Sequence, residues 1–407
     1  LIYSLDNNMD QIFVRLSYVQ LETNEVKSFE RIYSIEELKE YTLNILKEYE
    51  KFSVFIHNLR QERNKSIKNV DFPFETYREG QRKLINVVYY TIKEEEMLFA
   101  QAPTGIGKTI STIFPAVKAL GEEIGDRIIY LTPKTINRKV AKDTFERLRN
   151  EGLKFKSIIL TAKEKSCIND EFDCNPEKCA YAKEYYNKVN NVVLEVLIEN
   201  DDISIEILHC YAEKYKICPF ELALDVSLYC DGIICDYNYM FDPRVSLTRM
   251  IEQNDNIVLI DEAHNLIERA KSMYSASLSK DQILKCKKIA KGKLTKLHSV
   301  LGKLNSFFIE LRNECSHREV EWFYESDAPQ DLTKYLNMYL KESEEVLMKG
   351  AKFEGYDEIL QLYFDINYLY FLFNTIFLYI KKSLKGSFLL FIFIFIYFSL
   401  RKFISSI

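Results

Sequence analysis

The sequence predicts an α/β fold in which helices cover a parallel sheet, with one domain inserted into it and an all-α region after it. Short apolar runs alternate with longer stretches of helical periodicity, which is typical of parallel strands joined by crossover helices. The gap between residues 160 and 232 is too long for one crossover and indicates the insertion, and residues 273–380 keep helical periodicity with few breakers. The apolar runs lie at residues 97–100, 127–131, 157–160, 232–235 and 256–260.

The N-terminal region precedes this alternation and has its own pattern. Apolar and polar residues alternate over residues 13–21, which predicts a strand. Ser34 followed by Glu37 fits a capping box, so a helix is expected to begin there and to continue as a charged helix over residues 51–68. The segment Phe72-Pro73-Phe74 then breaks the helical pattern.

These breaks predict the domain organisation. The expected parts are residues 1–62 (N-terminal module and linker helix), 72–165 with 223–272 (α/β domain), 166–222 (insertion), 273–380 (all-α region) and 381–407 (apolar tail). The apolar run Phe388 to Phe398 is shorter than the roughly 20 residues of a typical membrane span. We therefore expect no membrane partner and assign the tail no function, with a membrane-tethered protein as the alternative.

A phosphate-binding loop follows the first apolar run. Gly105 and Gly107 let the backbone approach a phosphate closely, and the N–H groups at the following helix N-terminus can hold it. Lys108 adds a cation for the β- and γ-phosphates, and the Thr109 hydroxyl is a ligand for Mg²⁺. The loop comprises Ala102, Pro103, Thr104, Gly105, Ile106, Gly107, Lys108 and Thr109.

A second motif follows the last apolar run. Asp261 is expected to hold the same Mg²⁺, and Glu262 to orient and deprotonate the attacking water. His264 is placed to couple the nucleotide state to neighbouring loops. A single phosphate-binding pattern can arise by chance, but two motifs in this order, each beside a predicted strand, favour an ATP-driven motor. The Asp-Glu-Ala-His spelling is typical of helicases.

Composition sets wide bounds. A chain of 407 residues that is 47% hydrophobic can form two or more domains. The net charge of −5 gives no basic signature, although an acidic protein can still line one groove with Lys and Arg. Nine cysteines without a secretory leader indicate a reducing compartment, and we expect a cytoplasmic protein.

Four cysteines of the insertion suggest a metal site. Cys167, Cys174 and Cys179 are followed by Cys218, which stands alone beside a proline. Zinc sites favour paired cysteines, so this spacing is more typical of an iron–sulfur cluster with four thiolates. Zinc and buried free thiols remain alternatives, and Cys210 is a further candidate. Core packing is the better interpretation for the remaining cysteines, Cys230, Cys235, Cys286 and Cys315.

With these motifs the chain resembles the XPD/DinG family of superfamily 2 DNA helicases, over about residues 72–380. The segment Tyr77 to Gln81 resembles the family element that meets the adenine, with Arg78 and Gln81 as candidate contacts. Tyr130 to Thr135 resembles the motif that touches the DNA backbone, with Lys134 and Thr135 as candidates. Cys235 to Pro243 resembles the segment before the Asp-Glu-Ala-His box, which adds Asn238 and Tyr239 as candidate DNA contacts.

The resemblance implies a RecA-like first lobe, a [4Fe–4S] cluster on the four cysteines and a helical arch over residues 273–380. It also implies ATP-dependent 5′–3′ movement on single-stranded or forked DNA and a role in DNA repair. A non-catalytic DNA-binding or assembly module with a vestigial nucleotide site is the alternative. The sequence does not indicate an oligomeric state.

The two ends depart from the family pattern. Leu16 to Phe29 resembles the last strands of a RecB-like nuclease domain, but no nuclease activity is expected because the catalytic residues of such a domain lie upstream. Nothing after residue 380 resembles the second RecA-like lobe with its arginine finger. We therefore expect the chain to be truncated at both ends.

Overall fold

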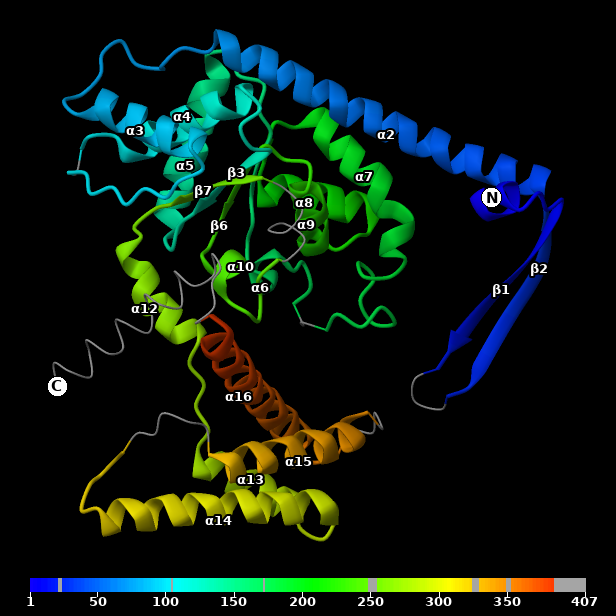
Figure 1. Cartoon of the computed structure of the whole chain (residues 1–407), viewed down its shortest axis with the longest axis vertical. Helices are drawn as coiled ribbons and strands as arrows, with labels where there is room; N and C mark the ends of the chain where they lie inside the picture. The colour runs from blue at the N-terminus through cyan, green and yellow to red at the C-terminus, as the bar shows by residue number, and fades with distance from the viewer. Residues whose placement is uncertain are drawn as a thin grey trace. The chain divides into compact units, whose positions relative to one another are not determined.

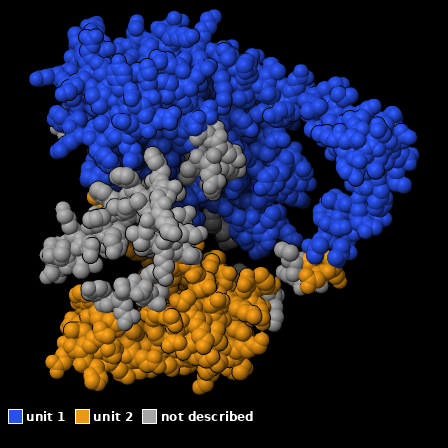
Figure 2. All heavy atoms as spheres, viewed as in Figure 1, with its two compact units in different colours: residues 1–19, 26–266 blue, residues 20–25, 267–407 orange. Residues whose placement is uncertain are grey.

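The computed structural model describes residues 1–20, 24–103, 105–170, 173–247, 255–323, 329–348 and 353–383. The chain divides into two compact units (Figure 2). The first comprises residues 1–19 and 26–266, and the second comprises residues 20–25 and 267–407. Each unit has its own core.

The first unit begins with a short helix, a hairpin and one long helix (Figure 1). These elements are α1 (Ile2–Asp6), β1 (Gln11–Val19), β2 (Val26–Ser34) and α2 (Ile35–Asn69). The strand predicted at residues 13–21 is confirmed as β1, which pairs antiparallel with β2. The capping box is also confirmed, because Glu37 N donates to Ser34 Oγ at 3.2 Å and Ser34 N donates to Glu37 Oε2 at 2.9 Å.

A five-stranded parallel sheet forms the centre of the first unit. Its strands, in the spatial order β5-β4-β6-β3-β7, are β5 (Asp202–Ile203), β4 (Ser157–Ile159), β6 (Gly232–Cys235), β3 (Arg127–Leu131) and β7 (Asn256–Ile260). Four of these strands coincide with predicted apolar runs, so the predicted parallel α/β fold is confirmed. β5 was not predicted, because two residues leave no periodic pattern.

The strand predicted at residues 97–100 is wrong, since this segment has no regular secondary structure. Met97 and Phe99 are 54% and 83% exposed, so the apolar side chains do not enter the core. Within the described residues β7 is the last strand at this end of the sheet, and its Val258 and Ile260 are both 37% exposed. A short apolar run becomes a strand only where a neighbouring strand pairs with its backbone, and here no pairing forms.

Helices cover the sheet and position the loops at its carboxyl edge. They are α3 (Gln81–Lys93), α4 (Lys108–Gly121), α5 (Thr135–Asn150), α6 (Lys163–Ser166), α7 (Tyr185–Glu199), α8 (Ile205–Tyr215), α9 (Pro219–Ser227) and α10 (Asn238–Phe241). A further helix, α12 (His264–Met273), follows β7 and continues into the second unit. α4 is the central helix of the core, where Ile113, Ala116 and Leu120 are fully buried. Its apolar surroundings fix the loop that precedes it.

The last turns of α2 pack into this same core. Ile67 and Val70 are each 1% exposed and join the cluster around α4 and β3. The approach is close: a Cβ on Gly121 would lie 2.4 Å from Ile67 Cγ2. Glycine at position 121 is therefore what allows α2 to lie against α4.

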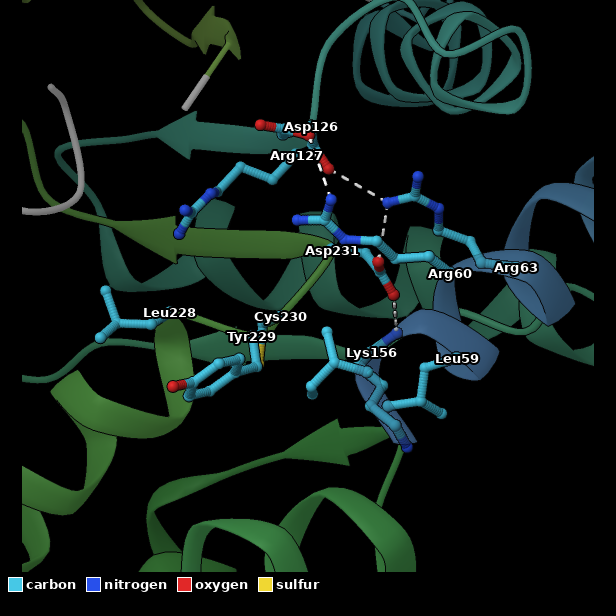
Figure 3. A pocket seen from close by; sticks show the side chains of 11 residues that line it. Leu59, Arg60, Arg63, Asp126, Arg127, Lys156, Leu228, Tyr229, Cys230 and Asp231 are labelled. Atoms are coloured by element: carbon cyan, nitrogen blue, oxygen red, sulfur yellow. Dashed lines mark hydrogen bonds and ion pairs between the residues drawn. The ribbon is translucent and has the colours of Figure 1, made fainter. Parts of the chain in front are cut away.

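Ionic contacts reinforce the attachment of α2 (Figure 3). Arg63 Nη1 lies 2.9 Å from Asp231 Oδ1 and also donates to Asp126 O at 3.0 Å. The other carboxylate oxygen of Asp231 accepts a hydrogen bond from Lys156 N at 2.8 Å. The Arg63 side chain is 6% exposed and that of Asp231 16%, so this is a largely buried ion pair at the amino end of β6. Burial raises the pKa of Asp231, and the charge of Arg63 opposes that shift.

The described part of the second unit from residue 267 onward is helical, as predicted for residues 273–380. It contains α13 (Lys280–Ala290), α14 (Thr295–His317), α15 (Gln330–Leu347) and α16 (Tyr356–Ser383). Their core includes Tyr339, whose hydroxyl donates to Ile359 O at 3.2 Å, and the buried Cys286, predicted to be a core residue. In the described stretches, every helix is too short or too polar to cross a bilayer. The apolar run 388–398 lies outside them.

Candidate nucleotide site

The phosphate-binding loop has the backbone conformation that its glycines predict. Gly105 and Gly107 have φ angles of +88° and +81°, a region that favours glycine. Gly107 is the N-cap of α4, so the free N–H groups of the first helical turn begin at Lys108 and Thr109. Thr104 lies outside the described residues. Lys108 is exposed and available for an anion.

The segment predicted to meet the adenine contacts this loop directly. Arg78 donates from its guanidinium to Gly105 O. Gln81 is 3% exposed, its Oε1 accepts from Arg78 N at 3.0 Å, and its Nε2 fills the space where a Cβ on Gly107 would lie, 2.7 Å away. Gly107 therefore serves two purposes, a positive φ and close packing against Gln81.

Asp261 lies at the carboxyl end of β7, beside the end of β3. Its backbone N–H donates to Leu131 O at 2.9 Å, which continues the sheet pairing by one residue. Asp261 Oδ2 accepts from Asn137 Nδ2 at 2.7 Å and from Thr132 Oγ1 at 3.3 Å. The carboxylate is thus held by side chains from two other elements.

Tyr130 connects the two motifs. Its ring is 2% exposed on β3, and Asp261 and Thr109 both lie near enough to its hydroxyl to shift its pKa. Burial, followed by the charge of Asp261, raises the pKa of Tyr130. The two predicted Mg²⁺ ligands, Thr109 and Asp261, therefore both lie near the Tyr130 hydroxyl.

Glu262 and His264 follow on the same turn. Glu262 has a φ of +52°, a left-handed conformation that raises the free energy of a residue with a side chain and that recurs at active sites. Its Oε2 lies 3.4 Å from His264 Nδ1. The Tyr237 hydroxyl donates to the backbone oxygens of Asp261 and Glu262. The fully buried Tyr237 ring therefore fixes the backbone of this turn.

The predicted DNA contacts divide into exposed and buried residues. Lys134 and Thr135 are exposed at the N-terminus of α5, where backbone N–H groups are also free of helical partners. Asn238 is partly buried at the start of α10. Tyr239 is 9% exposed and donates its hydroxyl to Thr161 O at 3.0 Å, so the ring is inside the unit and not on a surface that a base could reach.

The cysteines of the insertion are free thiols. Lys163 lies near Cys174 and Cys218, and Asn169 Nδ2 donates to Cys179 Sγ at 3.3 Å. Burial raises the pKa of Cys218, while backbone N–H groups at the start of α9 oppose the shift. Across the described ranges no three Cys, His, Asp or Glu side chains are grouped closely enough to hold a metal. The four thiols have the donor chemistry of an iron–sulfur site, and a cluster on them stays a prediction.

Sequence reasoning did not single out Tyr130, Thr132, Asn137 and Tyr237 as site residues. Tyr130, Thr132 and Tyr237 lie at or just after strand ends, which is the signal that could have found them, whereas Asn137 lies in the first turn of α5. Their role depends on which strand ends become neighbours, and that is a property of the sheet order β6-β3-β7.

Two family models match parts of the chain. The DEAD/DEAH box helicase model matches residues 78–189, and the DEAD_2 model matches residues 134–283. The chain is 22% identical over 342 residues to the human protein named regulator of telomere elongation helicase 1, which covers 72% of this chain and 27% of that protein. It is 25% identical over 339 residues to the Caenorhabditis briggsae homolog, with 72% and 33% covered.

The chain thus spans about a quarter to a third of the length of these relatives. A solved structure titled "Truncated XPD" is 19% identical, with 72% of this chain and 82% of that chain covered and a TM-score of 0.42. In sequence the chain is thus similar to DEAD/DEAH-box helicases and to the regulator of telomere elongation helicase 1.

Proposed function

We propose that this chain, a relative of the DEAD/DEAH-box helicases, is the ATP-binding half of a DNA helicase motor. Its first unit would bind ATP and Mg²⁺ and couple hydrolysis to 5′–3′ movement on single-stranded or forked DNA. The observation that carries the proposal is the placement of Asp261, whose carboxylate Asn137 and Thr132 hold at the carboxyl end of β7 and which lies, with Thr109 of the phosphate-binding loop, near the buried Tyr130.

The residues present fit a Mg²⁺–nucleotide complex. The free N–H groups at the start of α4 and the Lys108 ammonium would hold the phosphates, and Gln81 and Arg78 fix the loop that carries them. Thr109 and Asp261 supply the hydroxyl and carboxylate oxygens that Mg²⁺ prefers. Bound Mg²⁺ would neutralise charge that develops on the phosphates.

Glu262 is the proposed base for the attacking water. Its carboxylate is about one-third exposed, which leaves it open to a water molecule, and His264 lies beside it. Tyr237 holds the backbone at this turn, so Glu262 keeps its orientation although its φ is positive. Hydrolysis would also require an arginine from a second lobe, which is worth roughly 10³–10⁵ in rate in related phosphoryl-transfer enzymes.

The test is ATP binding and hydrolysis by the 407-residue chain, with and without single-stranded DNA. DNA-stimulated hydrolysis would support a complete motor, and ATP binding without turnover would support a first lobe that needs a second. Absence of any Mg²⁺-dependent ATP binding would contradict the proposal. A DNA affinity that is the same with and without nucleotide would favour the alternative of a non-catalytic module.

Replacement of Lys134 by alanine is expected to weaken binding of single-stranded DNA modestly and without regard to sequence. The residue is exposed at the N-cap of α5, where one ammonium and the helix N-terminus can meet one phosphate. The slope of log affinity against log salt should fall by about 0.7, the value for one phosphate contact on a single strand. The measurement is fluorescence anisotropy of a labelled oligonucleotide over a salt series. Lys139→Ala, exposed on the same helix, is the control and should leave the slope unchanged.

We also propose that Cys167, Cys174, Cys179 and Cys218 hold a [4Fe–4S] cluster. The support is their order in the chain, which resembles the order of the four cluster ligands in the XPD/DinG family. Anaerobically purified protein should contain iron and sulfide, and Cys218→Ser should lose both. Cys210→Ser, at an exposed thiol, should keep them. Zinc in place of iron, or equal loss in both variants, would reject the cluster.

A further inference from the structure

We infer that Asn137 is a positioning residue that fixes Asp261 for the metal and links it to the DNA-contacting end of α5. The inference rests on the proposed function and adds to it a residue outside the two nucleotide motifs. It starts from a single contact, the 2.7 Å hydrogen bond from Asn137 Nδ2 to Asp261 Oδ2.

The hydrogen bonds that Asn137 and Thr132 donate to Asp261 reach the same carboxylate oxygen. Asn137 Nδ2 and Thr132 Oγ1 each donate to Oδ2, at 2.7 and 3.3 Å. Among the described residues no side-chain nitrogen or oxygen hydrogen bond is made to Oδ1. A carboxylate rotates about one bond, so two donors on one oxygen also fix the direction of the other. Asn137 therefore keeps one oxygen of Asp261 available for a cation.

The donor comes from a defined position in α5. Asn137 is the third residue of the helix and partly buried, two residues after the exposed Thr135 and three after the N-cap Lys134. Any displacement of the first turn of α5 must therefore move the amide that holds Asp261.

The next residue makes a parallel contact. Arg138 Nη2 lies 3.4 Å from Asp236 Oδ2, and both side chains are less than one-fifth exposed. Asp236 follows β6 and Asp261 follows β7, the two strands that flank β3 in the sheet. Consecutive residues of α5 thus contact the carboxylates at the ends of both strands. The first turn of α5 is fixed to the sheet at two points, and one of those points is the proposed metal ligand.

The consequence is a physical link between DNA and metal. Phosphate binding at Lys134 and Thr135 would hold the first turn of α5, and Asn137 would transmit that restraint to Asp261. Because coupling between two binding sites is reciprocal, bound Mg²⁺–nucleotide should change the DNA affinity by the same factor as DNA changes the nucleotide affinity.

The experiment measures metal affinity directly and needs no turnover. Mn²⁺ binding to the chain with a non-hydrolysable ATP analogue is followed by electron paramagnetic resonance, for wild type, Asn137→Ala and Asn150→Ala. Asn150 is the matched control, because it is an exposed asparagine at the last residue of the same helix. Loss of a group that orients a metal ligand typically costs 10–100-fold in metal affinity, so we expect about a tenfold loss in Asn137→Ala only.

Two further readouts separate positioning from a general loss of structure. Binding of the analogue without metal should be unchanged in Asn137→Ala, which also verifies the fold. Asn137→Gln keeps the amide on a longer arm and should recover part of the Mn²⁺ affinity. The factor by which single-stranded DNA changes the metal-dependent nucleotide affinity should fall toward one in Asn137→Ala.

Two results would overturn the inference in distinguishable ways. Equal Mn²⁺ affinity in wild type and Asn137→Ala would remove the role of Asn137 and leave the nucleotide site standing. No metal-dependent nucleotide binding in wild type would overturn both the inference and the proposed function.

Discussion

Replacement of Lys108 by alanine is expected to abolish detectable nucleotide binding to the chain. The ammonium is the only side-chain cation of the loop Ala102–Thr109, and it follows directly on Gly107, which ends the loop at the helix N-terminus. Without it the phosphates would contact only backbone N–H groups, whose partial charges are smaller. Titration of a fluorescent ATP analogue with Mg²⁺ measures the effect, and micromolar affinity in the variant would count against this site.

Glu262→Gln tests hydrolysis separately from nucleotide binding, which Lys108→Ala tests. The amide keeps the size of the side chain but cannot accept a proton from water. Nucleotide binding should therefore survive in Glu262→Gln, while any hydrolysis present in the wild type should disappear. Loss of binding in both variants would indicate that the turn at residues 261–264 is needed for folding and would leave the role of Glu262 as a base unsupported.

Replacement of Arg63 by methionine is expected to destabilise the first unit by about 3–5 kcal/mol, the usual cost of leaving a buried charge without its partner. Arg63 and Asp231 are both largely buried, and Asp231 would remain a carboxylate without its hydrogen-bonded cation in a site shielded from water. Urea unfolding followed by circular dichroism measures the loss. Arg60→Met is the control: its guanidinium is half exposed and 3.5 Å from Asp126, and such exposed pairs contribute about 0–1 kcal/mol.

The loss of unfolding free energy in Arg63→Met should grow as the pH rises. Burial already raises the pKa of Asp231 in the folded protein, and loss of Arg63 removes the charge that opposes this. The folded state then binds a proton more tightly than the unfolded state, so stability falls as pH rises through the folded pKa. The variant should therefore approach wild-type stability under acid conditions and differ most near neutral pH.

A second substitution tests the same contact from the other side. Asp231→Asn removes the charge but keeps an oxygen that can accept from Lys156 N. Added to Arg63→Met, it should recover much of the lost stability and remove the added pH dependence. A deficit that persists in the double variant would mean that packing of the arginine stem, and not the uncompensated charge, dominates.

The sequence predicted those parts of the site that depend on local geometry. Gly105 and Gly107 adopt the positive φ angles that a phosphate-binding loop requires, and Asp261 follows a strand as expected. The parallel α/β arrangement was predictable because buried strands leave continuous apolar runs. The roles of Lys108, Asp261 and Glu262 stay predictions, since they concern chemistry with a bound nucleotide.

The remaining parts depend on contacts between distant segments. Arg63 and Asp231 are 168 residues apart in the chain, and no local pattern pairs them. Asn137 faces Asp261 only because α5 and β7 meet at the same edge of the sheet. The run at residues 97–100 shows the opposite case, in which a strong local pattern does not become a strand because its backbone finds no neighbour.

The long helix α2 has a mechanical consequence. Its last turns are fixed by Ile67, Val70 and the Arg63–Asp231 pair, whereas Tyr41 and Tyr49 nearer its start are 65% and 66% exposed. From Arg60 back to Ile35 the helix is a continuous arm of roughly 40 Å, at 1.5 Å per residue. A tilt of about 10° at the fixed end would move the hairpin at the other end by roughly 7 Å on an arm of this length. A lever of this kind would convert a small movement in the nucleotide-binding unit into a large displacement of whatever precedes α2.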